Sequence, residues 1–207
     1  MADHYFSARP GAPHRPGQVR VILPDVYLEL ETDAGVFSPS RLDPGTRLLL
    51  EAAPAPPARG DVLDLGCGYG PVACVLAARS PGAAVWAVDV NERALDLVTR
   101  NARRLGLARV TAARPDDVPA DLTFATIWSN PPIRIGKQAL HALLLRWLPR
   151  LEPGASAHLV VQRHLGADSL HAWLAVTLAD TATVERAGSA KGYRVLRVTA
   201  PPGTSPA

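Results

Sequence analysis

The sequence predicts an α/β fold, with a mostly parallel sheet and helices on both faces. Three observations lead to this prediction. From residue 58 onward, short apolar runs alternate with segments whose apolar residues recur at helical spacing. These runs are apolar almost throughout, as in strands that are buried on both faces. With 207 residues, the chain suits one domain that buries a large core without disulfides or metals.

Residues 1–57 are predicted to form an N-terminal arm, a β-hairpin and a short helix, all packed on the core. Residues 1–18 are rich in Pro, Gly and His, which indicates an irregular arm. Apolar and polar residues alternate over 19–32, which favours two half-buried strands. A helix is expected over 46–53, because the proline-rich stretch that follows it would end a helix there.

The core is predicted over residues 58–200, and residues 201–207 are expected to form a disordered tail. The apolar runs predict strands at 62–65, 85–88, 110–113, 124–129, 157–161, 183–186 and 193–198. The last two strands are expected to pair antiparallel. Helical spacing predicts the intervening helices at 72–79, 92–105, 137–148 and 169–178. Gly106 is expected to cap the second of these helices.

Composition excludes several classes of protein. No apolar run is long enough to span a bilayer and the N-terminus does not resemble a signal peptide, so a cytoplasmic location without a membrane partner is expected. Cys67 and Cys74 lack the spacing of metal ligands, so no metal is expected and both are predicted to be buried thiols. From Asn130 onward, nine Lys or Arg accompany four Asp or Glu, which permits an RNA-binding face or a solvated basic surface.

A glycine-rich loop follows the strand expected at 62–65, with the sequence Asp64-Leu65-Gly66-Cys67-Gly68-Tyr69-Gly70. Glycines in such a loop let backbone N–H groups approach a ligand, and the start of the next helix favours negative charge. The spacing lacks the third Gly of the dinucleotide fingerprint G-x-G-x-x-G. S-adenosylmethionine carries an ammonium and a carboxylate but no pyrophosphate. Asp64 for the ammonium and loop N–H groups for the carboxylate would match it.

Asp89 supports the same cofactor. It lies nineteen residues after Gly70, at the end of the next expected strand, where an acid commonly binds ribose hydroxyls. The prediction is therefore a site for S-adenosylmethionine. Binding of NAD is the alternative, and titration with each cofactor would distinguish the two.

A second motif, Asn130-Pro131-Pro132-Ile133, ends the strand expected at 124–129. Neither proline has an N–H, so the loop is rigid and leaves as acceptors the Asn130 amide oxygen and the carbonyls of Asn130 and Pro131. Two acceptors would hold the N–H groups of an exocyclic amine and expose its lone pair. We therefore expect methyl transfer to a nitrogen by positioning, without a strong base. The alternative is a turn that only ends a strand.

Most of the chain, about residues 4–198, resembles small-domain class I methyltransferases related to the ribosomal-RNA guanine-N2 methyltransferases. The resemblance rests on His4-Tyr5-Phe6-Ser7, Gly35-Val36-Phe37-Ser38, Leu42-Asp43-Pro44-Gly45-Thr46 and residues 61–71, 89–95, 129–137 and 192–196. Gly-Val-Phe-Ser and Asn-Pro-Pro-Ile-Arg-x-Gly-Lys are its most specific parts. The resemblance implies a seven-stranded Rossmann-like sheet, S-adenosylmethionine as the methyl donor and a guanine in RNA as the acceptor.

The resemblance also implies roles for individual residues. Cofactor contacts are expected from Asp64, Leu65, Gly66, Cys67, Gly68, Gly70, Asp89, Val90, Asp116 and Asn130. The catalytic residues that hold the target base are expected to be Asn130, Pro131, Pro132 and Ile133. Phe37 and Ser38 would close over the cofactor or flank the base. Arg134 and Lys137 would contact RNA phosphates, or else form a solvated helix start.

The predicted function is methylation of the exocyclic N2 of a guanine in ribosomal RNA. The aliphatic Ile133 favours guanine, because similar enzymes that act on adenine or glutamine tend to have an aromatic residue there. Two departures stand out: Phe124-Ala125-Thr126-Ile127 lacks an acid usual in the family, and the acid expected near the adenine after the third strand is not clear, with Asp116 chosen over Asp117. The larger bacterial enzymes also carry a second N-terminal domain. Alternatives are methylation of a protein glutamine or a small-molecule amine, and an RNA assembly factor that binds S-adenosylmethionine and in which catalysis is secondary.

Overall fold

The computed structural model describes residues 11–203 and contains a seven-stranded sheet with a separate two-stranded hairpin. The strand order in the large sheet is β5-β4-β3-β6-β7-β9-β8. Strands β5, β4, β3, β6 and β7 run parallel to one another, while β9 pairs antiparallel with both β7 and β8. Residues 1–10 of the expected arm and 204–207 of the expected tail lie outside the described residues. The sheet confirms the predicted fold class.

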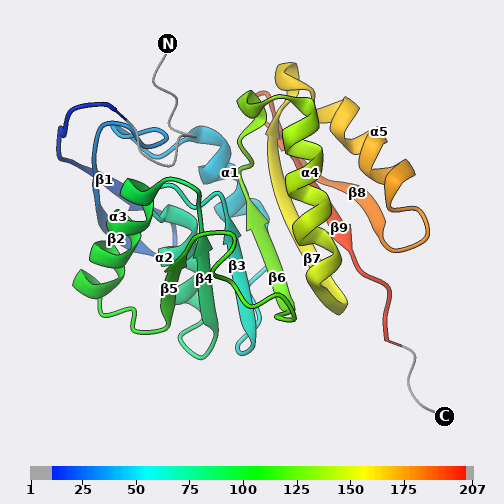
Figure 1. Cartoon of the computed structure of the whole chain (residues 1–207), viewed down its shortest axis with the longest axis horizontal. Helices are drawn as coiled ribbons and strands as arrows, with labels where there is room; N and C mark the ends of the chain where they lie inside the picture. Colours follow the sequence, from blue (N-terminus) through cyan, green and yellow to red (C-terminus); the bar gives the residue numbers. More distant parts are fainter. Residues whose placement is uncertain (1–10, 204–207) are drawn as a thin grey trace.

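From β3 to α5 the strands and helices alternate, except that β6 follows β5 directly (Figure 1). The strands are β1 (Gly17–Ile22), β2 (Tyr27–Thr32), β3 (Asp61–Leu65), β4 (Ala84–Val88), β5 (Val110–Ala113), β6 (Phe124–Ser129), β7 (Leu151–Gln162), β8 (Thr183–Ala190) and β9 (Tyr193–Thr199). The helices are α1 (Pro44–Ala52), α2 (Pro71–Arg79), α3 (Glu92–Arg104), α4 (Lys137–Trp147) and α5 (Ala167–Thr177). Short 3-10 turns cover Ile133–Ile135, Leu148–Arg150 and Arg163–Leu165.

Two apolar cores lie on opposite faces of the sheet. One contains side chains of the hairpin, α1, α2 and α3, and the other contains side chains of α4 and α5. Parallel strands that are covered on both sides are apolar throughout, which explains the runs in the sequence. Figure 1 shows the hairpin beside α3 and α5 at the other end of the sheet. None of the helices in residues 11–203 has the length and apolar character needed to cross a membrane.

Several boundaries differ from the expected ones, each for a local reason. Helix α1 begins at Pro44 instead of residue 46, because Asp43 caps it and proline suits the first turn. β7 begins at Leu151, six residues before the expected start; its first half contains Pro153 and Gly154, which disfavour a strand prediction. β8 extends to Ala190 as an exposed edge strand without an apolar run.

The predicted cap at the end of α3 is confirmed. Gly106 has a φ of +69° and donates to the carbonyl of Arg103, while Leu107 donates to the carbonyl of Ala102. This pair of bonds is the Schellman motif, which satisfies carbonyls at the end of a helix.

Asn101, fully buried on α3, ties the hairpin to the glycine loop. Its Oδ1 accepts from the N–H of Glu31 at 2.7 Å, and its Nδ2 donates to the carbonyl of Glu31 at 2.9 Å. The same Nδ2 donates to the carbonyl of Tyr69 at 3.0 Å. One amide therefore fixes β2 to α3 and to the loop that begins α2.

Candidate cofactor and substrate site

The glycine loop makes a tight turn between β3 and α2. Gly66, Gly68 and Gly70 have φ values of +77°, +54° and +93°, a region in which other residues are strained. A Cβ at Gly70 would lie 3.0 Å from Cγ2 of Val98, so α3 packs directly on this glycine. A Cβ at Gly68 would meet nothing within 4 Å. The backbone at Gly68 therefore borders open space.

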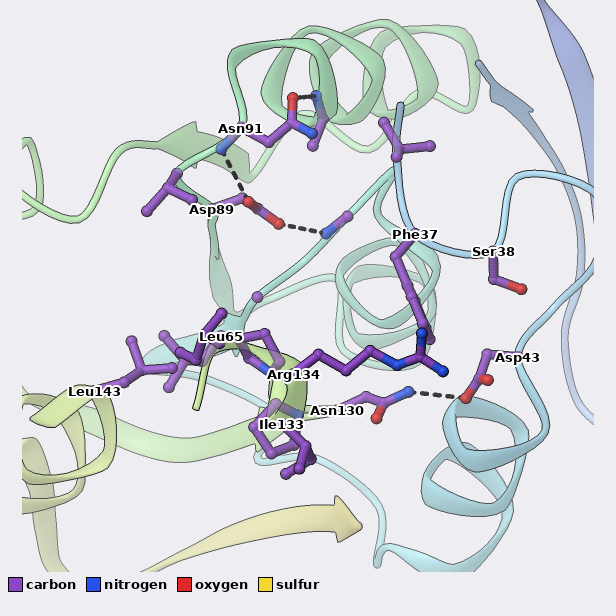
Figure 2. Close-up of a pocket in the computed structure, with 18 of the residues that line it drawn as sticks. Phe37, Ser38, Asp43, Leu65, Asp89, Asn91, Asn130, Ile133, Arg134 and Leu143 are labelled. Carbon is purple, nitrogen blue, oxygen red and sulfur yellow. Dashed lines mark hydrogen bonds between the residues drawn. The ribbon is translucent and has the colours of Figure 1, made fainter. Parts of the chain in front are cut away.

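Asp89, at the end of β4, links the glycine loop to the start of α3. Its Oδ2 accepts from the N–H of Gly68 at 2.9 Å, and its Oδ1 accepts from the N–H of Asn91 at 3.0 Å (Figure 2). Asn91 in turn caps α3 by accepting from the N–H groups of Arg93 and Ala94. Burial raises the pKa of the Asp89 carboxyl above its ordinary value, although these hydrogen bonds oppose the rise.

Asp64 does not reach the cavity, contrary to the expected contact with the cofactor ammonium. Its side chain is 1% exposed, and its Oδ2 accepts from the N–H of Ala73 in the first turn of α2 at 2.9 Å. Burial raises the pKa of Asp64 to about 8, while the bond from Ala73 lowers it. The carboxyl group satisfies a helix N–H instead of facing a ligand.

A cavity of about 690 Å³ opens where β3, β4 and β6 end. This edge of an open α/β sheet is where ligands bind, and the volume falls within the roughly 300–1,000 Å³ of small-molecule sites. Its walls include the predicted residues Phe37, Ser38, Leu65, Gly66, Gly68, Asp89, Val90, Asn130, Pro131, Pro132, Ile133 and Arg134. The structure therefore gathers most of the predicted site residues around one cavity.

Five predicted residues do not line the cavity. Asp64 is bonded within the protein, as described above. Cys67 is buried with its thiol facing the interior, and burial raises its pKa. Gly70 packs on α3, and Lys137 is exposed at the start of α4. Asp116 has an 88% exposed side chain that pairs with Arg146 at 2.9 Å.

Asn130 is held in one orientation by two acceptors. Its Nδ2 donates to Oδ1 of Asp43 at 2.8 Å (Figure 2). The same Nδ2 donates to Oγ1 of Thr46 at 2.9 Å. Because a carboxylate only accepts hydrogen bonds, the NH₂ side of the amide must face Asp43. Neither a backbone nor a side-chain donor in residues 11–203 bonds to Oδ1 of Asn130. That oxygen is therefore free to accept from a ligand.

The Asn-Pro-Pro turn is rigid. Pro132 has φ −74° and ψ 76°, and the N–H of Ile133 donates to the carbonyl of Pro131 at 2.8 Å, which together make an inverse γ-turn. The Pro131 carbonyl, expected to be free, thus uses one lone pair inside the turn and keeps the second. Before the turn, Oγ of Ser129 donates to the carbonyl of Leu65 at 2.6 Å, which fixes β6 against the glycine loop.

The sequence did not indicate a role for Asp43 or Tyr193, although both line the cavity. Asp43 also accepts from the N–H of Thr46 at 2.9 Å and so caps α1. An acid directly before Pro44 is a helix-start signal, so the cap was open to prediction, but its contact with Asn130 was not. Tyr193 closes the wall next to Gly45, where an added Cβ would come within 2.7 Å of the ring.

The residues around the cavity fit S-adenosylmethionine. Gly68 leaves space for a ligand beside the backbone, Asp89 offers carboxylate oxygens, and the apolar side chains of Val88, Val90 and Leu143 provide a surface for a flat base. The N–H groups of Gly66, Cys67, Gly68 and Gly70 already bond within the protein, contrary to the expectation that loop N–H groups bind the cofactor carboxylate. Among the described residues, no group of three His, Cys, Asp or Glu side chains is placed to hold a metal ion.

Residues 27–197 match the family described as methyltransferase small domain. The chain belongs to this family. The match confirms the predicted S-adenosylmethionine-dependent methyltransferase and its cofactor. Within the family, the uncharacterized protein YbxB of Bacillus subtilis (strain 168) is 32% identical over 200 residues, which cover 95% of this chain and 98% of YbxB.

Other similar proteins are longer than this chain. Ribosomal RNA small subunit methyltransferase C of Shewanella amazonensis is 31% identical over 163 residues, which cover 77% of this chain and 47% of the relative. The chain thus spans about half the length of this methyltransferase. The solved structure titled T. thermophilus 16S rRNA N2 G1207 methyltransferase (RsmC), in complex with AdoMet and guanosine, has a TM-score of 0.77. The matched part is 24% identical and covers 92% of this chain and 52% of RsmC. This likeness supports the fold.

Proposed function

We propose that this methyltransferase modifies the exocyclic N2 of a guanine in RNA, with ribosomal RNA as the substrate. The observation that carries the proposal is the fixed amide of Asn130, whose two N–H groups are held by Asp43 and Thr46. Its free oxygen is an acceptor at the edge of the cavity. An amine of the substrate is the complementary donor.

The chemistry at this amine depends on its lone pair, which is delocalised into the base ring. S-adenosylmethionine supplies a methyl group on a sulfonium. The lone pair of the amine would attack the methyl carbon as the S–C bond breaks, S-adenosylhomocysteine would leave with that electron pair, and the methylated nitrogen would then lose a proton to water. Oδ1 of Asn130 would accept one N–H, and the second lone pair of the Pro131 carbonyl, in the same turn, would accept the other. Hydrogen bonds from the amine to both acceptors, Asn130 and Pro131, favour a pyramidal amine nitrogen. The rigid turn then contributes by positioning, and no strong base is required.

The choice of guanine and of RNA has separate support. Ile133 lines the cavity with an aliphatic side chain, where adenine and glutamine methyltransferases tend to have an aromatic residue. Relatives named ribosomal RNA small subunit methyltransferase C share the family, and the RsmC structure was solved with guanosine. A base in a folded RNA would have to leave its stack to enter the cavity. A ribosomal substrate agrees with the cytoplasmic location expected from the sequence.

The test is mass spectrometry of ribosomal-RNA nucleosides from a strain that lacks the gene. We expect loss of an N2-methylguanosine signal, which returns with the native chain but not with Asn130→Ala. Gln138→Ala, which removes an exposed amide on α4, is the matched control and should restore the signal.

Other results would favour the other functions. An unchanged methylguanosine profile would contradict the guanine proposal and favour a protein glutamine or a small-molecule amine. If the deletion slows growth and Asn130→Ala restores it without restoring methylation, the assembly-factor function would be favoured.

A further inference from the structure

We propose that Arg134 determines base specificity, by donating hydrogen bonds to O6 and N7 of the guanine whose N2 is held by Asn130. This inference rests on the proposed function and names a second contact within the same site. It assigns Arg134 a contact with the base itself, in place of the phosphate contact expected from the sequence.

The position of Arg134 is the first support. It follows the Asn-Pro-Pro motif directly, in the 3-10 turn Ile133–Ile135, and it lines the cavity. Figure 2 shows its side chain reaching across the cavity toward Asn130 and Asp43, below Phe37. The rigid γ-turn before it limits where this side chain can begin.

The lack of an internal partner is the second support. Within residues 11–203, no carboxylate lies in ion-pair distance of Arg134 and no acceptor is bonded to its guanidinium. Oδ1 of Asp43 already accepts from Asn130 and from the N–H of Thr46. A guanidinium has five N–H donors and no acceptor, so Arg134 presents unused donors to the cavity.

The two side chains together match the pattern of guanine. Guanine carries the N2 amine at one end of its base-pairing edge, and O6 at the other end with N7 beyond it. Asn130 offers an acceptor for the amine, and Arg134 offers donors for O6 and N7. Arginine paired with O6 and N7 is the commonest specific contact with guanine in nucleic-acid complexes. A purine with an amine at position 6 would place the N–H donors of that amine against the N–H donors of Arg134.

Lys137 provides a matched contrast because it lies three residues later and carries the same charge. Both residues are exposed, but only Arg134 lines the cavity. Removal of its charge should weaken binding of any RNA through the phosphates, without a change in preference among bases. Removal of Arg134 should change that preference.

The experiment measures binding of free nucleosides to the full chain saturated with S-adenosylhomocysteine, which occupies the cofactor part of the cavity. Fluorescent 2-aminopurine riboside is the reporter. Guanosine and 2,6-diaminopurine riboside compete with it; both keep the 2-amine, but the second has an amine in place of O6. For the native chain we expect guanosine to compete about tenfold to a hundredfold better, the range for one bidentate base contact.

Arg134→Ala should reduce this preference to less than about twofold, mainly because guanosine binds more weakly. Arg134→Lys should keep part of the preference. Lys137→Ala should leave it unchanged. An undiminished preference in Arg134→Ala would overturn the inference while the proposed function stands. If the native chain binds guanosine no better than inosine, which lacks the 2-amine, the proposed function fails and this inference fails with it.

Discussion

The side-chain amide of Asn130 donates to Oδ1 of Asp43 over 2.8 Å, although the two residues are 87 positions apart. The same carboxylate caps helix α1, so the N-terminal segment and the Asn-Pro-Pro turn share one acceptor. The orientation of the proposed catalytic amide therefore depends on where α1 begins.

Two replacements of Asp43 should show whether the Asn130 amide needs the negative charge of this side chain or only its acceptor oxygen. Asp43→Ala removes the acceptor and lets the Asn130 amide turn, so we expect kcat for RNA methylation to fall at least about tenfold, since a hydrogen bond to a charged group is worth roughly 1.5–3 kcal/mol. Loss of the cap should also cost about 1 kcal/mol of unfolding free energy. Asp43→Asn keeps an oxygen for both donors and should retain most of the kcat.

Kinetics at saturating RNA and cofactor, together with urea unfolding, check this prediction. Thr46→Val, which removes only the second acceptor of Asn130, should lower kcat less than Asp43→Ala does. Full kcat in Asp43→Ala would show that the amide keeps its orientation without Asp43.

Asp89 should control cofactor affinity. Its carboxylate accepts from the glycine loop and from the start of α3, and it borders the cavity. Asp89→Ala would free the loop and remove the expected ribose acceptor, so we predict at least about tenfold weaker binding of S-adenosylhomocysteine, equivalent to roughly 1.4 kcal/mol. Calorimetric titration measures this. Asp96→Ala, an exposed acid on the same helix α3, is the control and should bind normally; equal affinities in both variants would contradict the role.

The raised pKa of Asp64 predicts how stability depends on pH. With a pKa of about 8 in the folded protein and an ordinary value near 3.8, Asp64 keeps its proton on folding and loses it on unfolding between these pH values. The unfolded state then binds fewer protons, so the free energy of unfolding falls as pH rises from about 4 to about 8.

Asp64→Asn removes this titration and keeps an oxygen for the N–H of Ala73. We expect its free energy of unfolding, measured in urea, to fall less over this pH range than that of the native chain, with a difference of at least about 1 kcal/mol by pH 8. Measurement of both proteins from pH 5 to 8 tests this. Parallel curves would mean that Asp64 is ionised in the folded protein.

Lys137 should contribute to RNA affinity only through salt-dependent attraction. Lys137→Ala should reduce the slope of log affinity against log salt concentration by about 0.7–0.9, the value for one lost phosphate contact, and leave kcat unchanged. Filter binding of ribosomal RNA over a salt series measures the slope. Arg103→Ala removes an exposed cation near the far end of α3 and is the control. A slope equal to the native one would place Lys137 outside the RNA contact.

The fold was predictable wherever one local pattern decides the structure. Buried parallel strands leave apolar runs, so β4, β5 and β6 were found within a residue at either end. The first half of β7 was missed because Pro153 and Gly154 disfavour a strand, and its pairing depends on neighbours that are distant in sequence. Tertiary pairing overrides local preference there.

The residues of the candidate site were likewise predictable only where a local pattern decides their position. Gly68, Asp89 and Asn130 lie at the ends of strands, and the order of elements places such residues at one edge of the sheet. Asp64 was misplaced because the sequence does not show that its carboxyl turns toward α2 and bonds to Ala73. Asp43 was missed for the opposite reason, since only the folded chain brings it to Asn130.

The side-chain amide of Asn101 bonds to the backbone of Glu31 as a neighbouring strand would. It donates to the carbonyl of Glu31 and accepts from its N–H. At that point a side chain closes the edge of the small hairpin, where a free strand would otherwise invite pairing with another chain. An engineer who trimmed the chain to residues 58–200 would leave this buried amide with only Tyr69 as a partner. Such a minimal enzyme would also expose the apolar side chains of α2 and α3 that the hairpin and α1 cover, so it is not expected to fold well.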